Sequence, residues 1–444
     1  MLSKITLSQR VFIVFLIAIH AGYFISALIL NHIYTPDSPE YLLDAINIKE
    51  HFTSYCGNWN EVKISGLYSL RTPFYGIFIM LAKSIINSDF FVIFIQNIFS
   101  LASCLFISKL FRGTHYTSIS NLFILCSLLF FPVYLIMVNS IMSDIFLMAW
   151  LVLALAFFIQ YIKNKKSTWM LFYNLALAAA VMTKPVMMFF WLPNIFITLY
   201  FFVRLRQKPL LFYWCILPLV IFFWSERNKN ITGYFHFSSI EMQNILELNA
   251  GTVLTIKYDM DSSKTFQHSL IKKADSIPDF AIRSKYIFST SENIVKDNLL
   301  IYTYAHMRGM LNLMLATGRE NQMSFFAQEE KAPISIVYEA QKKGFLNGIL
   351  YYLGNVNIAF LVIGALVALW NVLTLITFIL GMFSKNMNAT IKIFIYILVV
   401  YIVFACGPGG YARFKTSIIP FLLYTFPFGW EVLKKIFKKN AVQS

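Results

Sequence analysis

The sequence predicts a mainly α-helical, polytopic membrane protein with about ten spanning helices and one external polar domain. Hydrophobic residues make up 58% of the 444 residues, charged residues only 13%, and the mean hydropathy is +0.64. These values lie far from those of soluble proteins. Short basic clusters such as KNKK at 163–166 and RLRQK at 204–208 separate the apolar runs, which is the positive-inside pattern of membrane proteins.

The net charge of +16 comes from 37 Lys and Arg against 21 Asp and Glu. In a soluble protein this excess would indicate nucleic acid as a partner. Here the excess of Lys and Arg lies largely in the clusters between apolar runs, where the positive-inside rule explains it. We therefore expect the lipid bilayer, and no nucleic acid, as a partner.

The first apolar run, residues 11–30, follows Lys4 and Arg10 and is predicted to be an uncleaved signal-anchor that begins in the cytoplasm. Residues 31–71 then form the first external loop. The segment 72–86 is apolar but short for a span, so it is either a spanning helix or, as we prefer, a re-entrant or interfacial one.

Within the first external loop, Ser38 followed by Pro39 is typical of a helix N-cap and first turn. Apolar residues then recur near helical spacing up to Phe52. This pattern predicts an amphipathic helix over 39–52 that lies on the membrane surface.

Six further spans are expected before the polar domain, at 90–110, 119–138, 141–162, 169–182, 186–203 and 209–224. Residues 225–345 hold no spanning run and contain most of the Asp, Glu, Ser and Asn. They are predicted to form an external domain of mixed secondary structure with a helical stretch near Glu292–Leu315.

The apolar run 348–383 is either one tilted helix with an interfacial lead-in or two short helices, and spans at 391–405 and 418–430 follow it. The chain thus divides into an N-terminal membrane bundle (1–224), the polar domain (225–345) and C-terminal membrane helices (346–444). Counting 348–383 as one span places both termini in the cytoplasm. The basic clusters, at 109–115, 163–166, 204–208 and 434–439, then share one side of the membrane.

In this topology five ionisable residues lie at external helix ends, where they are costly and are candidates for function. They are Asp37, Asp144, Lys184, Arg227 and Arg413. Asp37 either caps the helix that begins at Pro39 or takes a proton from an attacking hydroxyl. Asp44, seven residues later on roughly the same helix face, is a second candidate.

The remaining candidates also have two interpretations each. Asp144 either caps the following helix or orients the donor, the acceptor or a metal ion. Lys184, between two apolar runs, either snorkels or contacts a phosphate. Arg227 and Arg413 suit bidentate recognition of phosphate or carboxylate, and Lys415 lies two residues beyond Arg413.

Six motifs follow one another along nearly the whole chain. They are PDSPEY at 36–41, RTPFYGIFIMLAK at 71–83, NSIMSDIF at 139–146, MTKP at 182–185, WSERNKNITGYFHFS at 224–238 and YARFKTSIIPF at 411–421. In order and spacing they resemble the GT-C superfamily of membrane glycosyltransferases. The nearest branch resembles the protein O-mannosyltransferases and the lipid A aminoarabinose transferases.

The resemblance implies a role for most of the candidates. It makes Asp37 the catalytic base and Asp144 a second acid at a position where relatives often carry Glu. It places Lys184, Arg413 and Lys415 on the donor phosphate, and we expect Arg227 to join them. Three residues in or beside the first two motifs are expected to contact substrate: Tyr41, Asp44 and Arg71.

The implied activity is inverting transfer of a sugar from a polyprenyl-phosphate donor to a hydroxyl of a lipid, glycan or protein acceptor. It would take place at the external (periplasmic) face of the plasma (inner) membrane. No cofactor is assigned. The first loop has one clear Asp where some branches carry an Asp-Glu pair, so a divalent metal ion stays open.

The chain departs from the family in a second way, since the polar domain of many relatives follows the last helices and here it lies at 225–345. That leaves the acceptor open. A transporter or flippase of lipid-linked saccharides is the alternative, although it would place ionisable residues near the bilayer midplane. A polymerase or ligase of surface polysaccharide would share the lipid-phosphate chemistry.

Overall fold

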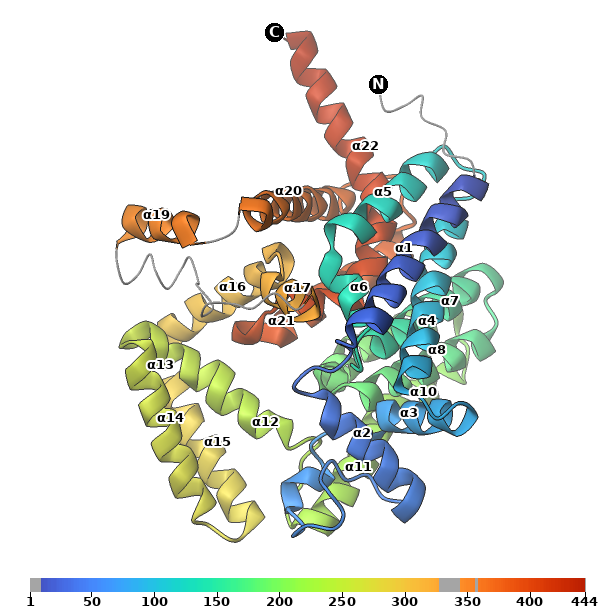
Figure 1. Cartoon of the computed structure of the whole chain (residues 1–444). Helices are drawn as coiled ribbons and strands as arrows, with labels where there is room; N and C mark the ends of the chain where they lie inside the picture. Colours follow the sequence, from blue (N-terminus) through green and yellow to red (C-terminus); the bar gives the residue numbers. More distant parts are fainter. Residues whose placement is uncertain (1–8, 327–343, 356–357, 444) are drawn as a thin grey trace.

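The computed structural model describes residues 9–326, 344–355 and 358–443, and every regular element in these ranges is helical (Figure 1). The first half contains α1 (Gln9–Leu30), α2 (Ser38–His51), the 3₁₀ turn η2 (Ser65–Tyr68), α3 (Pro73–Ile85), α4 (Asp89–Leu110), α5 (Thr117–Phe130), α6 (Pro132–Val138), α7 (Asp144–Asn164), α8 (Ser167–Thr183), η3 (Pro185–Phe190), α9 (Trp191–Leu205), α10 (Leu210–Tyr213) and α11 (Ile216–Thr232).

The second half contains α12 (Ile240–Gln243), the π-helical η4 (Asn244–Ala250), α13 (Gly251–Lys257), α14 (Met260–Asp275), α15 (Phe280–Lys296), α16 (Leu299–Leu315), α17 (Arg319–Phe326), α19 (Phe345–Asn355), α20 (Ile358–Gly381), α21 (Ala389–Cys406), η5 (Gly407–Gly409), η6 (Ala412–Ile418) and α22 (Ile419–Gln443). The expected mixed structure of the polar region is therefore wrong for its described residues, which are helical. The remainder, 327–343, lies outside the described residues.

The chain is a multi-pass membrane protein by the length and apolarity of its helices. In the described residues seven segments are long and apolar enough to cross a membrane: α1, α4, α7, η3 with α9, α10 with α11, α20 and α21. An eighth is added if the bent pair α5 and α6 counts as one span. Two of the ten expected spans are not among these segments. Helix α8 is shorter, with 17 residues, and α22 carries charged residues in its second half.

Two expected elements of the first half differ in their ends or their continuity. The span predicted over 119–138 is broken, because α5 and α6 meet at 78°. Pro132 begins α6, and Phe131 before it has left the helical region with φ −118° and ψ 64°, as expected of a residue that precedes proline. The span predicted at 209–224 runs on to Thr232, so the first eight residues of the expected polar domain continue a membrane helix.

The other differences lie in the second half of the chain. The helical stretch expected near Glu292–Leu315 is divided between α15 and α16. The run 348–383 forms two helices, α19 and α20, and residues 356–357 between them lie outside the described ones.

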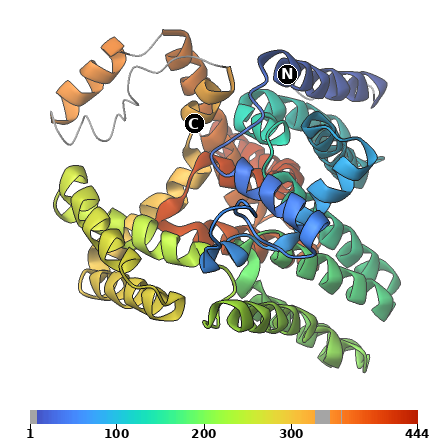
Figure 2. The ribbon, with the colours of Figure 1, turned by 60° about the horizontal axis from the view of Figure 1, so that its bottom comes forward.

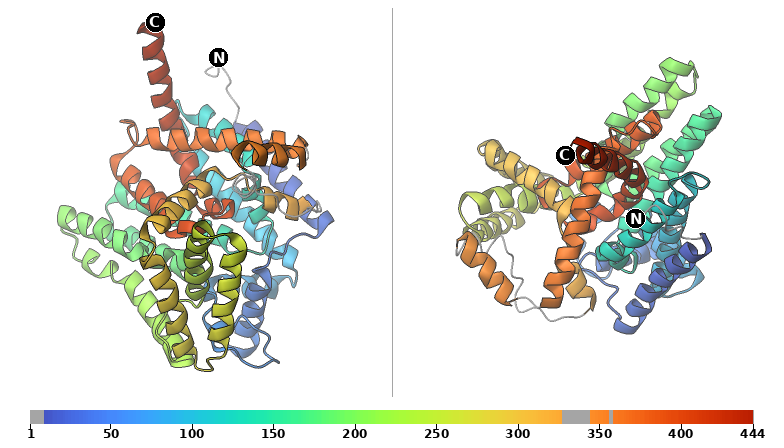
Figure 3. Two further views of the ribbon diagram at one scale, coloured as in Figure 1. Left: turned by 90° about the vertical axis from the view of Figure 1, so that its left-hand side faces the viewer. Right: turned by 90° about the horizontal axis from the view of Figure 1, so that it is seen from above.

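Helix α7 is the central helix of the bundle. In its spanning window 61% of the residues are buried, against 17% for α1 and for α10 with α11. It packs on α8, α4 and η6. Helices α12 to α15 stand to one side of the bundle (Figure 2), and α20 crosses α22 at a steep angle (Figure 3), where Gly429 of α22 lies against the Thr377 carbonyl.

Helix α2 forms where the sequence predicts it, but its N-terminus differs from expectation by one residue. The helix begins at Ser38, so Asp37 and not Ser38 holds the cap position. Its apolar residues Tyr41 and Ala45 are buried, at 2% and 4% exposure, against a small core shared with α3, α4 and the α6–α7 turn. This packing holds Asp37 beside the ends of the membrane helices.

Candidate functional site

The Asp37 carboxylate binds two arginines that come from distant parts of the chain. Its Oδ1 lies 3.1 Å from Arg71 Nη2, and its Oδ2 accepts a hydrogen bond from Arg413 Nη1 at 3.0 Å. Although Asp37 occupies the cap position of α2, its side chain makes no capping hydrogen bond. Capping therefore does not explain this aspartate in the structure.

Arg71 binds a second carboxylate, Glu40, which is not among the residues predicted from the sequence. Its Nε and Nη2 donate to Glu40 Oε2 at 2.7 and 2.6 Å. The guanidinium also stacks over the ring of Tyr41 at 5.0 Å. Glu40 lies three residues after Asp37, a spacing that places both on one helix face, so the sequence held a signal for this residue.

A second ion pair joins the two remaining charged candidates of the membrane bundle. Lys184 Nζ donates to Asp144 Oδ1 at 2.6 Å, and the side chain of Asp144 is only 1% exposed. Asp144 is the first residue of α7, and Lys184 lies between α8 and η3. The Oδ2 atom of Asp144 is buried with no hydrogen-bond partner, so the pair leaves one acceptor atom for a ligand or a water molecule.

Two contacts join the Asp37 group to the Asp144 group. The ring of Phe414 lies 4.9 Å from Lys184 Nζ and 5.0 Å from the Arg413 guanidinium, a distance at which cations are attracted to an aromatic face. The Tyr41 hydroxyl lies within hydrogen-bond distance, 2.9 Å, of the Ser143 hydroxyl next to Asp144. Phe414 and Ser143 were not predicted, although each adjoins a candidate in the sequence.

Arg413 owes its position to a close crossing between α16 and η5. A Cβ added at Gly309 of α16 would overlap the Gly407 backbone, and a Cβ added at Gly410 would overlap the Gly309 carbonyl. Asn312 Nδ2 donates to the Gly410 carbonyl at 2.6 Å. Glycine is required here because two backbones approach each other. The segment η6, which carries Arg413 and follows η5, packs against α7.

We call the six linked side chains the ion cluster. They are the cations Arg71, Lys184 and Arg413 and the carboxylates Asp37, Glu40 and Asp144. Three positive charges therefore balance three negative charges. The cluster lies at helix ends, as the topology predicted for four of its members.

The charges around Asp37 set its acidity. Burial raises the pKa of this carboxyl, but Arg71, Arg413 with its hydrogen bond, and Lys184 lower it by more, so the pKa lies below its usual value. Asp37 is therefore ionised at neutral pH. Held between two guanidiniums, it is a weak proton acceptor.

Asp44 and Arg227 lie apart from the ion cluster. Arg227 donates to the carbonyls of Tyr68 and Ser54 and to Asn228, so it anchors the segment between α2 and α3 to α11. Asp44 is fully buried and accepts from the Ser54 hydroxyl at 2.7 Å. Its other oxygen has no hydrogen-bond partner, and burial raises its pKa to about 7.

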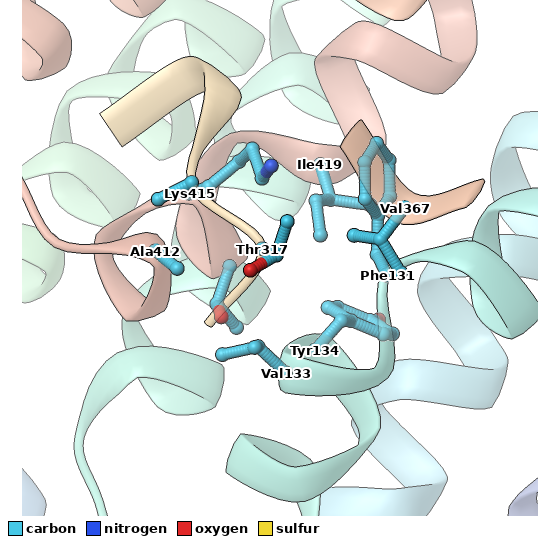
Figure 4. A pocket seen from close by; sticks show the side chains of 10 residues that line it. Phe131, Val133, Tyr134, Thr317, Val367, Ala412, Lys415 and Ile419 are labelled. Atoms are coloured by element: carbon cyan, nitrogen blue, oxygen red, sulfur yellow. The ribbon is translucent and has the colours of Figure 1, made fainter. Parts of the chain in front are cut away.

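Lys415 also has surroundings of its own. Its Nζ donates to the Met314 carbonyl at 3.1 Å and to Asn371 Oδ1 at 2.7 Å, over the ring of Phe131. It lines a small cavity at the α5–α6 bend (Figure 4) together with Tyr134, Thr317 and others. Burial lowers its pKa to about 7, and the structure gives it no contact with the ion cluster.

In the described residues no three His, Cys, Asp or Glu side chains are grouped where they could hold a metal ion. Comparisons with protein-family models and with curated proteins find no match to this chain.

Proposed function

We propose that this protein is an inverting membrane glycosyltransferase that uses a polyprenyl-phosphate sugar. The observation that carries the proposal is the position of Asp37 between Arg71 and Arg413, next to the Lys184–Asp144 pair. A carboxylate beside several phosphate-binding cations is what this reaction needs. The order of the six motifs, which resembles the GT-C superfamily, supports it independently.

The chemistry divides between the carboxylates and the cations. Asp37 takes the proton of an acceptor hydroxyl as the hydroxyl oxygen attacks the anomeric carbon from the face opposite the phosphate. The bond between that carbon and the phosphate oxygen breaks, and the polyprenyl phosphate leaves with the electron pair. Arg413 and Lys184 stabilise its charge, so no protein acid is needed. Tyr41 and Arg71 would contact the substrate from the side of α2.

The proposed site lies at the external face of the plasma membrane, with both termini in the cytoplasm. The basic clusters of the sequence support this side. The arrangement in Figure 1 agrees, since the start of α1 and the end of α22 lie toward one end of the molecule and Asp37 follows the other end of α1. The donor's lipid tail would lie among the apolar spans.

The location of the ion cluster favours an enzyme over a transporter. Asp37, Arg71, Asp144 and Lys184 all flank or begin helices. A transport site is typically built near the bilayer midplane by interrupted helices. Transfer to a surface polysaccharide by a ligase would use the same phosphate chemistry, and the identity of the acceptor decides between the two transferases.

The test measures release of polyprenyl phosphate from polyprenyl-phosphate sugars by the purified protein in the presence of candidate acceptors. Asp37→Asn is expected to lower the rate at least about 100-fold, the usual contribution of a general base. The matched control is Asp89→Asn, because Asp89 is also paired with a basic side chain, Lys83 at 2.7 Å, outside the ion cluster. Equal rates for the two variants would contradict the assignment.

A further inference from the structure

The charge balance of the ion cluster bears on how it can bind a phosphate. A site for an anionic phosphate group normally carries surplus positive charge. Here each of Arg71, Lys184 and Arg413 already binds a carboxylate. A phosphate added to the intact cluster would meet Asp37 and Glu40 at close range, and like charges at such distances repel. One carboxylate therefore has to leave its basic partner before a phosphate can bind.

The contacts indicate that Asp37 is the carboxylate that the phosphate displaces. Asp144 is 1% exposed and would have to leave Lys184 inside the protein, which is costly for a buried charge. Glu40 binds Arg71 through two nitrogens and leaves Arg413 untouched. Asp37 is 24% exposed, makes a single contact with each arginine, and has no capping bond to α2.

The geometry of Asp37 also matches the group that would replace it. Its two oxygens bridge two guanidiniums, one at 3.1 Å and the other at 3.0 Å. A phosphate presents oxygens at a similar spacing and can bridge the same two arginines. Arg71 remains bound to Glu40 through Nε in either arrangement, so the site stays assembled during the exchange.

We propose that Arg71 and Arg413 form a phosphate-binding site that Asp37 occupies in the free protein, and that the donor phosphate enters by displacing Asp37 from both arginines. This rests on the proposed function for the identity of the phosphate. The displaced carboxylate stays at the α2 N-terminus, next to the bound donor. Without its two guanidinium partners it regains basicity, so donor binding itself prepares the base that the transfer requires.

The proposed exchange predicts that phosphate binds more tightly when the Asp37 carboxylate is removed. The probes are farnesyl phosphate, a short polyprenyl monophosphate, and inorganic phosphate, titrated against the full-length protein in detergent. Asp37→Asn is expected to bind both about tenfold more tightly than the wild type, because the competing carboxylate is gone, and tenfold corresponds to about 1.4 kcal/mol. Asp89→Asn, which changes the net charge equally, is expected to bind as the wild type does.

A weaker or unchanged affinity in Asp37→Asn would overturn the exchange, since it would mean that Asp37 only orients the arginines. A gain limited to farnesyl phosphate would overturn it too, because the headgroup is the group said to displace Asp37. Arg413→Gln is expected to lose most of the affinity.

Asp37→Asn leaves two arginines partly unpaired and can lower stability. A second variant, Asp37→Ser, and a thermal-shift measurement of both variants therefore accompany the titration. If the variants are destabilised, farnesyl phosphate is expected to raise their melting temperature more than that of the wild type. An equal or smaller rise would contradict the exchange.

The outcomes also separate the exchange from the proposed function. Loss of transfer together with weaker phosphate binding in Asp37→Asn would keep the glycosyltransferase and discard the exchange. Tighter binding in a protein whose wild type releases no polyprenyl phosphate would keep the phosphate site and discard the glycosyltransferase.

Discussion

Asp37 lies 3.0 Å from Arg413, although 376 residues separate the two in the chain. The contact joins the segment between α1 and α2 to the segment that follows α21. Arg71 completes it from the other side. The N-terminal bundle and the C-terminal helices therefore share one charged site, and changes in either half are expected to affect it.

Replacing Arg413 by lysine keeps the charge but removes the planar fork that binds two oxygens at once. We expect Arg413→Lys to raise the KM for the lipid-linked donor about tenfold, equivalent to about 1.4 kcal/mol, with a smaller effect on stability. Steady-state assays of polyprenyl phosphate release measure it. Arg204→Lys is the control, since Arg204 is exposed and contacts Tyr200 on α9. A KM equal to that of the wild type would remove Arg413 from the phosphate site.

The Lys184–Asp144 pair predicts a non-additive effect on stability. Lys184→Met leaves Asp144 buried without a cation, which costs about 3–5 kcal/mol. Adding Asp144→Asn removes the uncompensated charge, so the double variant is expected to recover most of the lost stability but not the transferase activity. Thermal unfolding in detergent measures the four members of the cycle. Additive losses would show that the two side chains do not interact.

Asp44 predicts a stability that depends on pH. Burial raises its pKa to about 7 from an ordinary 3.8, so the folded state favours the protonated form. The stabilisation is complete below pH 3.8 and is lost as the pH rises through about 7. Asp44→Asn, which resembles the protonated acid, is expected to be more stable than the wild type at pH 8, by up to about 4 kcal/mol at about 1.4 kcal/mol per unit.

At pH 5 the difference between Asp44→Asn and the wild type should be smaller than at pH 8. The measurement is the melting temperature of both proteins across this pH interval. A constant difference at every pH would mean that Asp44 does not titrate there.

The approach of α16 to η5 predicts that Gly309 cannot accept a side chain. A Cβ at this position would overlap the Gly407 backbone, and overpacking of this kind costs about 1–3 kcal/mol. We expect Gly309→Ala to lower the melting temperature and, by shifting η6, to weaken donor binding through Arg413. Gly22→Ala is the matched control, since an added Cβ at that α1 glycine meets no atom within 4 Å. Equal behaviour of the two variants would rule out the contact.

Hydropathy predicted most of the membrane helices because their burial in lipid depends on local composition. α1, α2, α4, α7 and α21 lie where the sequence places them, to within a few residues. The break between α5 and α6 has a local signal in Pro132, which the apolar run concealed. Apart from the stretch expected near Glu292–Leu315, the helical character of 225–326 was missed because polar surface helices lack a strong apolar period.

The site was predictable in part. Topology alone gathers Asp37, Asp144, Lys184 and Arg413 at helix ends, and the structure joins them in one ion cluster. Arg227 and Lys415 carry the same charge in similar sequence surroundings but contact backbone carbonyls and amide side chains. Sequence cannot separate these cases, because the partner of a charged side chain is set by segments tens to hundreds of residues away.

The sequence by itself determined that the chain is a helical membrane protein and that its unusual charges stand at helix ends, because both follow from the transfer of single residues between water and lipid. Only the tertiary structure decided which charges pair. Pairing depends on the distance between side chains from separate helices, and that distance is set by packing such as Gly309 against Gly407. Asp37 was a possible helix cap in the sequence, and in the structure it is the carboxylate held between Arg71 and Arg413.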